Sequence, residues 1–94
     1  MARINWSQDA LLDLSRVQLY LARENPSAAM RAATKIQQQV DLLAIYPEFG
    51  PRDGTAAGQR KLIVPFGENN YLLRYRWHDD VIYILRIWHS REDY

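Results

Sequence analysis

The sequence predicts an α+β fold in which an antiparallel pair of helices packs on a small, mainly antiparallel β-sheet. Apolar residues recur at helical spacing in two early stretches, residues 10–21 and 29–43. Strict alternation follows at residues 71–77, and residues 81–89 form a nearly continuous apolar run. A sheet covered by helices on one face accommodates these patterns, with the element order β-α-α-β-β-β.

A short strand and a helix are expected at the start of the chain. Ile4 and Trp6 lie on one side of residues 3–6, which is the period of a strand. Ser7 is a favourable N-cap, and Asp9 places an acid in the first helical turn. The stripe of this helix that faces the core is predicted to contain Ala10, Leu14, Val17 and Leu21.

A second helix is expected to follow closely. Pro26 disfavours helix in the residue before it but is tolerated in a first turn, with Asn25 or Ser27 as N-cap. The apolar stripe begins with small residues and ends with large ones: Ala29, Ala33, Ile36, Val40 and Leu43. The helix should end at Tyr46, and the short connection predicts a helical hairpin.

The rest of the chain is predicted to be a three-stranded meander. Residues 47–58 hold two Pro and three Gly and read as a loop. Strands are expected at residues 59–66, 71–77 and 81–89, separated by turns at 67–70 and 78–80. In the middle strand, one side should face the helices and carries Tyr71, Leu73, Tyr75 and Trp77.

Composition limits the class of protein. With 94 residues, 48% of them hydrophobic and 24% charged, we expect one globular domain spanning residues 1–94. The absence of Cys excludes disulfides and thiolate metal sites, and we expect no metal or cofactor. No signal peptide or membrane-spanning stretch is visible, so we expect a cytoplasmic protein. The net charge of +1 does not by itself indicate nucleic-acid binding.

Cations concentrate on the predicted meander. Arg74 and Arg76 share one side of a strand, Arg60 and Lys61 lie on the strand before, and Arg86 on the strand after. Neighbouring strands are about 4.8 Å apart, so four or five cations could gather on one face. Two interpretations remain open: a solvated outer face, or a site for phosphate or for acidic groups of a partner.

Three further residues are candidates for function. Arg86 lies within "YILRIW" and needs an anionic or carbonyl partner; an internal salt bridge with Asp79, Asp80 or Glu92 is the simplest. His89 could exchange protons near neutral pH or could be a structural residue at a strand end. Tyr94 could act as an acid or base, stack on a nucleobase, or end a frayed terminus. None of the common nucleotide-binding, zinc-protease or serine-hydrolase motifs is present.

The C-terminal string "YLLRYRWHDDVIYILRIWHSRED" resembles the RelE/ParE superfamily of toxins of type II toxin–antitoxin systems. The shared pattern is Tyr-Arg before a short acidic turn, followed by V-x-I-L-R-(apolar)-x-H-x-R. It falls on Tyr75, Arg76, Asp80, Val81, Tyr83, Ile84, Leu85, Arg86, Ile87, His89 and Arg91. "QRKLIVPFGENNYLLRYR" and "LLAIYPEFG" are similar to upstream parts of the same family.

This resemblance implies a growth-inhibiting, cytoplasmic toxin of a plasmid-stabilisation module. A cognate antitoxin would neutralise it by wrapping an extended or helical segment around it, and an apolar groove is expected to receive that segment. Operator DNA would be bound only through the toxin–antitoxin complex.

Two mechanisms divide the family. A RelE-like toxin is an mRNA interferase that cleaves mRNA on the ribosome. In that case Arg74, Arg76 and Arg86 would clamp phosphate, His89 would be the acid or base, and Tyr94 would stack or donate a proton. A ParE-like toxin binds and blocks DNA gyrase without cutting nucleic acid.

The choice of residues favours the ParE-like branch. RelE-like nucleases tend to be rich in lysine near the site, whereas this chain has only Lys35 and Lys61. The string "ILRIWHSRED" is also closer to ParE-like sequences. In either branch Arg91 is expected to join the basic surface of the sheet.

Overall fold

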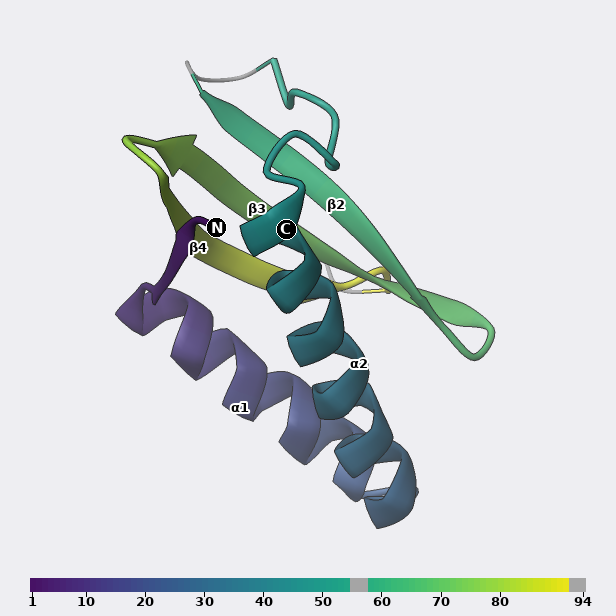
Figure 1. Ribbon diagram of the computed structural model, residues 1–94. Helices are drawn as coiled ribbons and strands as arrows, with labels where there is room; N and C mark the ends of the chain where they lie inside the picture. Colours follow the sequence, from purple (N-terminus) through teal and green to yellow (C-terminus); the bar gives the residue numbers. More distant parts are fainter. Residues whose placement is uncertain (55–57, 92–94) are drawn as a thin grey trace.

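A computed structural model describes residues 1–54 and 58–91 and confirms the predicted α+β element order. Figure 1 shows both helices on the same face of the sheet. We call the opposite face the outer face. The elements are β1 (Arg3–Trp6), α1 (Gln8–Ala22), α2 (Pro26–Ile45), β2 (Gln59–Phe66), β3 (Asn69–His78) and β4 (Val81–His89).

The four strands lie in the order β1-β4-β3-β2. Strands β2, β3 and β4 form the predicted antiparallel meander, while β1 pairs with β4 in parallel. The last strand, β4, therefore lies inside the sheet, between β1 and β3. This position between two strands explains why the sequence of β4 is apolar almost throughout.

Side-chain caps start both helices. The Ser7 Oγ accepts a hydrogen bond from the Ala10 N–H at 3.0 Å, as predicted. Asn25, rather than Ser27, caps α2, because its Oδ1 accepts from the Ala28 N–H at 3.1 Å. The two caps fix where each helix begins, and only residues 23–25 connect α1 to α2.

The core lies between the two helices and the sheet. Tyr71, Leu73 and Tyr75 are fully buried, as predicted, but Trp77 near the end of β3 is 38% exposed. In α2 the predicted Ala29 is buried, but Ala32 is buried in place of the predicted Ala33, which is only partly buried. Large contributions also come from Ile36, Val40, Leu43, Ile82, Ile84 and Ile87.

A β-bulge interrupts the pairing of β3 with β4. Arg74 pairs with Arg86, but the next residue, Tyr75, pairs with Ile84, so Leu85 has no opposite residue. The extra residue reverses the alternation of side chains along β4. Ile84 and Ile87 therefore both face the helices although they are three positions apart, and Arg86 points to the outer face.

Both hairpins have two-residue turns, so β3 is longer than predicted at each end. Asp79 and Asp80 connect β3 to β4 with φ of 49° and 62°, as a type I′ turn requires. Gly67 begins the other turn with φ of 61°. Two aspartates thus occupy left-handed conformations that are costly for residues other than glycine.

We expect Asp80→Gly to raise the free energy of unfolding by about 0.5–1 kcal/mol. The relief of the left-handed conformation should exceed the added entropy of the unfolded chain. Glu68→Gly is the matched control, because Glu68 lies in the other turn without a positive φ and should not stabilise. Urea unfolding measures both, and equal effects would contradict the strain at Asp80.

Candidate functional site

Four of the predicted cations share the outer face of the sheet. Lys61 pairs with Arg74 across β2 and β3, and Arg74 pairs with Arg86 across β3 and β4. Arg76 lies two residues beyond Arg74 on the same side and is exposed. The structure therefore brings together a basic patch, which we define as Lys61, Arg74, Arg76 and Arg86.

The other two predicted cations lie elsewhere. Arg60 pairs with the buried Tyr75, so its side chain lies on the opposite side of β2 from Lys61. There its Nη1 donates to the carbonyls of Gly50, at 2.9 Å, and Glu48, at 3.2 Å. Arg91 is exposed in the turn after β4. Arg60 is thus engaged in holding the loop before β2.

An aromatic ring supports two cations of the basic patch. The guanidinium carbons of Arg74 and Arg86 lie 5.0 and 5.3 Å from the ring centre of Trp88. Trp88 itself is only 8% exposed. Both distances are within the range of cation–π attraction, so the indole reduces the cost of placing two cations side by side.

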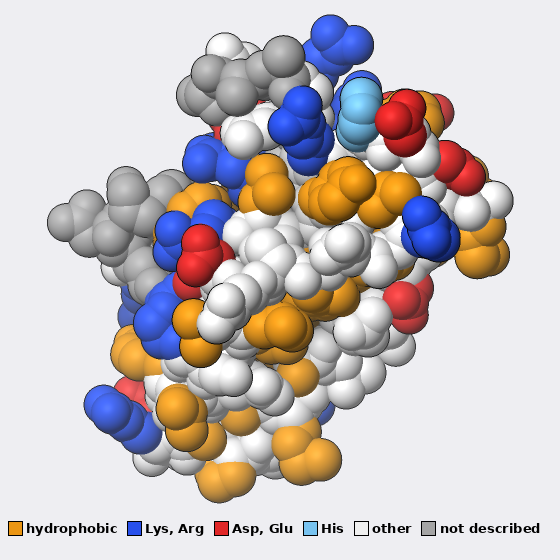
Figure 2. Space-filling model, turned by 90° about the vertical axis from the view of Figure 1, so that its left-hand side faces the viewer, with side chains coloured by type: hydrophobic (Ala, Val, Ile, Leu, Met, Phe, Trp, Pro, Cys, Tyr) orange, Lys and Arg blue, Asp and Glu red, His pale blue; other side chains and the backbone are white. Residues whose placement is uncertain are grey.

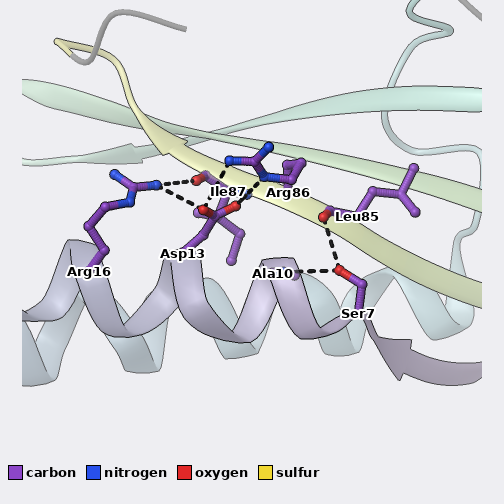
Figure 3. Close-up of polar contacts among 7 residues, drawn as sticks. All are labelled: Ser7, Ala10, Asp13, Arg16, Leu85, Arg86 and Ile87. Atoms are coloured by element: carbon purple, nitrogen blue, oxygen red, sulfur yellow. Dashed lines mark hydrogen bonds and ion pairs between the residues drawn. The ribbon is translucent and has the colours of Figure 1, made fainter.

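Among the residues that the structure describes, Arg86 pairs with Asp13 of α1 rather than with Asp79 or Asp80, two of the acids proposed from the sequence. Arg86 donates through Nε to Oδ2 of Asp13 at 2.7 Å and through Nη2 to Oδ1 at 3.2 Å, a two-pronged contact (Figure 3). The third proposed partner, Glu92, lies outside the described residues. A sequence signal existed, because Asp13 lies between Ala10 and Val17 on the stripe that faces the core.

Asp13 also completes the edge of β4. Strand β1 ends at Trp6, and α1 then runs beside the second half of β4. The Ile87 N–H donates to Oδ2 of Asp13 at 2.9 Å, and Arg16 donates to both the Ile87 carbonyl and Asp13 at 3.1 Å. Side chains of the helix replace a missing strand (Figure 3).

The ionised form of Asp13 is favoured. Burial by itself raises the pKa of this carboxyl, but the hydrogen bonds from Arg86, the Ile87 N–H and Arg16 together outweigh burial. The pKa of Asp13 is therefore held below its ordinary value of 3.8. The carboxylate is a charged structural group rather than a proton donor near neutral pH.

Arg74 has its own acidic partner. Its Nε lies 2.8 Å from Oδ2 of Asp53, whose side chain is largely buried. This contact is a charge pair rather than an in-line hydrogen bond. Both basic groups beside Trp88 are thus paired with carboxylates from distant parts of the chain.

Tyr75 fixes the loop that delivers Asp53. The Tyr75 hydroxyl donates to the Pro47 carbonyl at 2.7 Å and accepts from the Gly50 N–H at 2.9 Å. Burial raises the pKa of Tyr75, outweighing the Gly50 bond and the charge of Arg60, so the phenol stays neutral. A Cβ on Gly50 would meet the ring of Tyr75 at 2.8 Å, which explains a glycine there.

His89 lies on the other side of the sheet from the basic patch. It pairs with Tyr71, faces the helices and is 4% exposed. Its ring centre lies 5.4 Å from that of Tyr71 and 5.8 Å from that of Tyr20, and its Nδ1 accepts from the Arg91 N–H. The structure therefore does not bring His89 to Arg74.

The remaining predicted site residue, Tyr94, lies outside the described residues. Across residues 1–54 and 58–91, no three His, Asp or Glu side chains lie close enough to hold a metal ion. In the same part of the chain, no helix is both long and apolar enough to cross a membrane.

Apolar side chains are exposed on the helical hairpin. Leu12, Leu19 and Met30 are 61%, 67% and 73% exposed. Figure 2 shows hydrophobic side chains distributed over the lower part of the molecule, where the hairpin lies, and cations mainly towards the top and left of that view. The helical hairpin therefore leaves several large apolar side chains open to solvent.

Comparison with known proteins identifies the class to which this fold belongs. A family model described as the ParE toxin of the type II toxin–antitoxin system parDE matches residues 4–94, so the chain belongs to this family. Membership of this family implies that the protein has a cognate antitoxin as its partner.

Relatives and a solved structure agree with this assignment. The chain is 37% identical to "Toxin RelE2" of Caulobacter vibrioides, covering 96% of this chain and 97% of that protein. It is 35% identical to "Toxin RelE3" of the same organism, covering 98% of each. A structure titled "Chromosomal ParDE TA system from P. aeruginosa" matches with a TM-score of 0.75 and 25% identity, over 97% of this chain and 98% of that one.

We expect Asp13→Asn to lower the free energy of unfolding by about 2–3 kcal/mol at pH 7, because the charge-assisted bonds to the β4 edge and Arg86 are weakened. Asp9→Asn is the matched control in the exposed first turn of the same helix and should cost only a few tenths of a kcal/mol.

The same pair of variants tests the pKa of Asp13. Because its folded pKa is lowered, its contribution is present above the unfolded carboxyl pKa of about 4 and is lost as the pH falls through the lower folded value. The difference in free energy of unfolding between wild type and Asp13→Asn, measured by urea unfolding, should therefore become smaller below about pH 4. A gap that stays constant down to pH 2 would contradict a lowered pKa.

Proposed function

We propose that this toxin is a ParE-like inhibitor of DNA gyrase that acts by binding. The match to the ParE family over residues 4–94 and the likeness to a ParDE structure support this branch. The observation that weighs most is the separation of His89 from the basic patch. A nuclease needs its acid or base and its cations around one phosphate, whereas here the imidazole faces the helices and Arg74 faces outwards.

The basic patch supplies the contact with the target. Arg74 and Arg86 are already paired with carboxylates, but no described carboxylate lies within ion-pair distance of Lys61 or Arg76. Exposed cations of this kind steer association with acidic surfaces and fix orientation. Binding alone, with no bond made or broken, is then sufficient to block the enzyme.

The antitoxin covers the apolar surface of the helical hairpin. A hollow of about 480 Å³ lies between α1 and α2 and is lined by Leu19, Ala22, Ala29 and Met30, among others. An amphipathic helix or extended segment of the antitoxin would bury these side chains. The toxin acts in the cytoplasm, where both gyrase and the antitoxin are found. It binds operator DNA only as part of the toxin–antitoxin complex.

Purified toxin should block supercoiling of relaxed plasmid by gyrase. We expect the double variant Lys61→Ala/Arg76→Ala to need about tenfold more protein for the same inhibition, since two cations are removed from the contact. Arg23→Ala removes an exposed cation at the far end of α1 and should inhibit like wild type. Normal supercoiling at a large excess of folded toxin would exclude the proposal.

A second candidate function is ribosome-dependent cleavage of mRNA. The names of the relatives, "Toxin RelE2" and "Toxin RelE3", favour it, as does the cluster of Arg74 and Arg86 around Trp88. With His89 on the other side of the sheet, Arg74 would stabilise the phosphate charge and Tyr94 would supply the proton chemistry.

For this candidate, translation extracts should show codon-phased cuts in mRNA. Arg74→Ala and Tyr94→Phe should reduce cleavage by about 100-fold, whereas His89→Gln should keep most of the activity of the folded protein. Circular dichroism checks that each variant is folded. Intact mRNA in extracts with wild-type toxin would reject this function. Loss of cleavage in His89→Gln alone would reject the roles assigned to Arg74 and Tyr94.

A further inference from the structure

The outer face of the sheet is hollowed beside one cation of the basic patch. This outer hollow has a volume of about 310 Å³ and is lined by Arg76, His78, Tyr83 and Leu85. Both helices lie on the other face of the sheet, so neither of them covers it (Figure 1). The outer hollow is therefore open to a partner.

The β-bulge explains why a hollow forms at this place. Tyr83 pairs with Arg76, and Leu85 is the extra residue of the bulge, two positions further along β4 on the same side. The other two arginines of the basic patch lie 5.0 and 5.3 Å from the ring centre of Trp88, further along β4. Their side chains are thus drawn towards the indole and leave space between Arg76 and Leu85.

Tyr83 separates the outer hollow from a second one at β1. The second hollow has a volume of about 340 Å³, and Arg3, Asn5 and Tyr83 are among its lining residues. Asn5 pairs directly with Tyr83. Tyr83 is therefore a ridge between a hollow that contains the aliphatic Leu85 and a hollow that contains polar side chains.

A cation stands on each side of this ridge. Arg76 lines the outer hollow and Arg3 lines the second one, and both are exposed. Within the described chain, no carboxylate lies within ion-pair distance of either guanidinium. Because β4 lies between β3 and β1, the two cations belong to strands about 10 Å apart.

We propose that the two hollows anchor the toxin on its target. An apolar side chain of gyrase enters the outer hollow between Tyr83 and Leu85, and acidic side chains before and after it bind Arg76 and Arg3. Tyr and Arg are the residue types that most often dominate the energy of protein interfaces. This role rests on the proposed binding of gyrase, and it assigns a central anchor within that contact.

The charges around the outer hollow favour a protein over other occupants. Oδ2 of Asp79 lies 3.2 Å from Nε2 of His78, which lines the hollow. A nucleic acid has a phosphate at every nucleotide and would bring negative charge against Asp79 and its neighbour Asp80. A second copy of the chain would bring equal cations together. A protein can instead place single carboxylates on the two arginines alone.

The first test compares full-length variants for affinity to purified gyrase and for inhibition of supercoiling. Tyr83→Ala removes the ridge and should weaken both at least tenfold, whereas Tyr83→Phe keeps the ring and should stay within about threefold of wild type. Leu85→Asp places an acid in the outer hollow and should weaken both at least as much as Tyr83→Ala. Ile63→Ala is the control, because Ile63 is an exposed apolar residue outside both hollows, and should act like wild type.

A second test uses the absence of Cys from the chain. Gln59 pairs with Arg76 at the rim of the outer hollow, so Gln59→Cys can carry a photoreactive label without blocking the hollow. With gyrase and plasmid DNA present, the label should attach to gyrase, on a peptide in which an apolar residue has acidic neighbours. Arg23→Cys, exposed at the end of α1, is the matched control and should not label gyrase.

The outcomes separate the anchor from the proposed function. Normal supercoiling with excess wild-type toxin overturns both. If wild type inhibits gyrase and both Tyr83→Ala and Leu85→Asp inhibit equally well, the anchor alone is wrong. The anchor is also overturned if the label attaches to DNA, or to a gyrase peptide without acids. Circular dichroism checks folding, and if Tyr83→Ala does not fold, Leu85→Asp and the labelling decide.

Discussion

The carboxylate of Asp13 joins the helical hairpin to the sheet. Strand β1 is only four residues long, so the second half of β4 has no strand beside it. Residues of α1 supply the missing partners instead: Asp13 binds the Ile87 N–H and Arg16 binds the Ile87 carbonyl. The same carboxylate holds Arg86, so the edge of the sheet and one cation of the basic patch depend on a single buried acid.

The β-bulge at Leu85 makes this arrangement possible. With regular alternation from Ile82 and Ile84, Arg86 would point among the helices and Ile87 would point outwards. The extra residue reverses the two, so the isoleucine enters the core and the guanidinium reaches Asp13 around the strand edge. It also places His89 among Tyr20 and Tyr71, on the other side of the sheet from the cations. The bulge therefore separates the imidazole from the basic patch.

Local sequence patterns are sufficient to predict the helices and strands, but not the contacts between them. Capping at Ser7 and alternation along β3 depend on neighbours in sequence, so both could be predicted. The bulge could not, because "VIYILRIWH" is apolar on both sides and its periodicity gives no register. Without the register, sequence patterns place Arg60 with the outer cations and give no sign that Arg86 reaches Asp13, an acid that is 73 residues away along the chain.

The ion pairs limit what the basic patch can do. A phosphate that sought Arg74 or Arg86 would compete with carboxylates that lie 2.8 and 2.7 Å from these side chains. Displacing them would expose the buried Asp53 or open the edge of β4 at Asp13, and an unpaired buried charge costs several kcal/mol. These two arginines are therefore bound into the structure as much as they are offered to a ligand. Lys61 and Arg76, for which no described carboxylate lies within ion-pair distance, are the groups of the patch that can take a new partner at little cost.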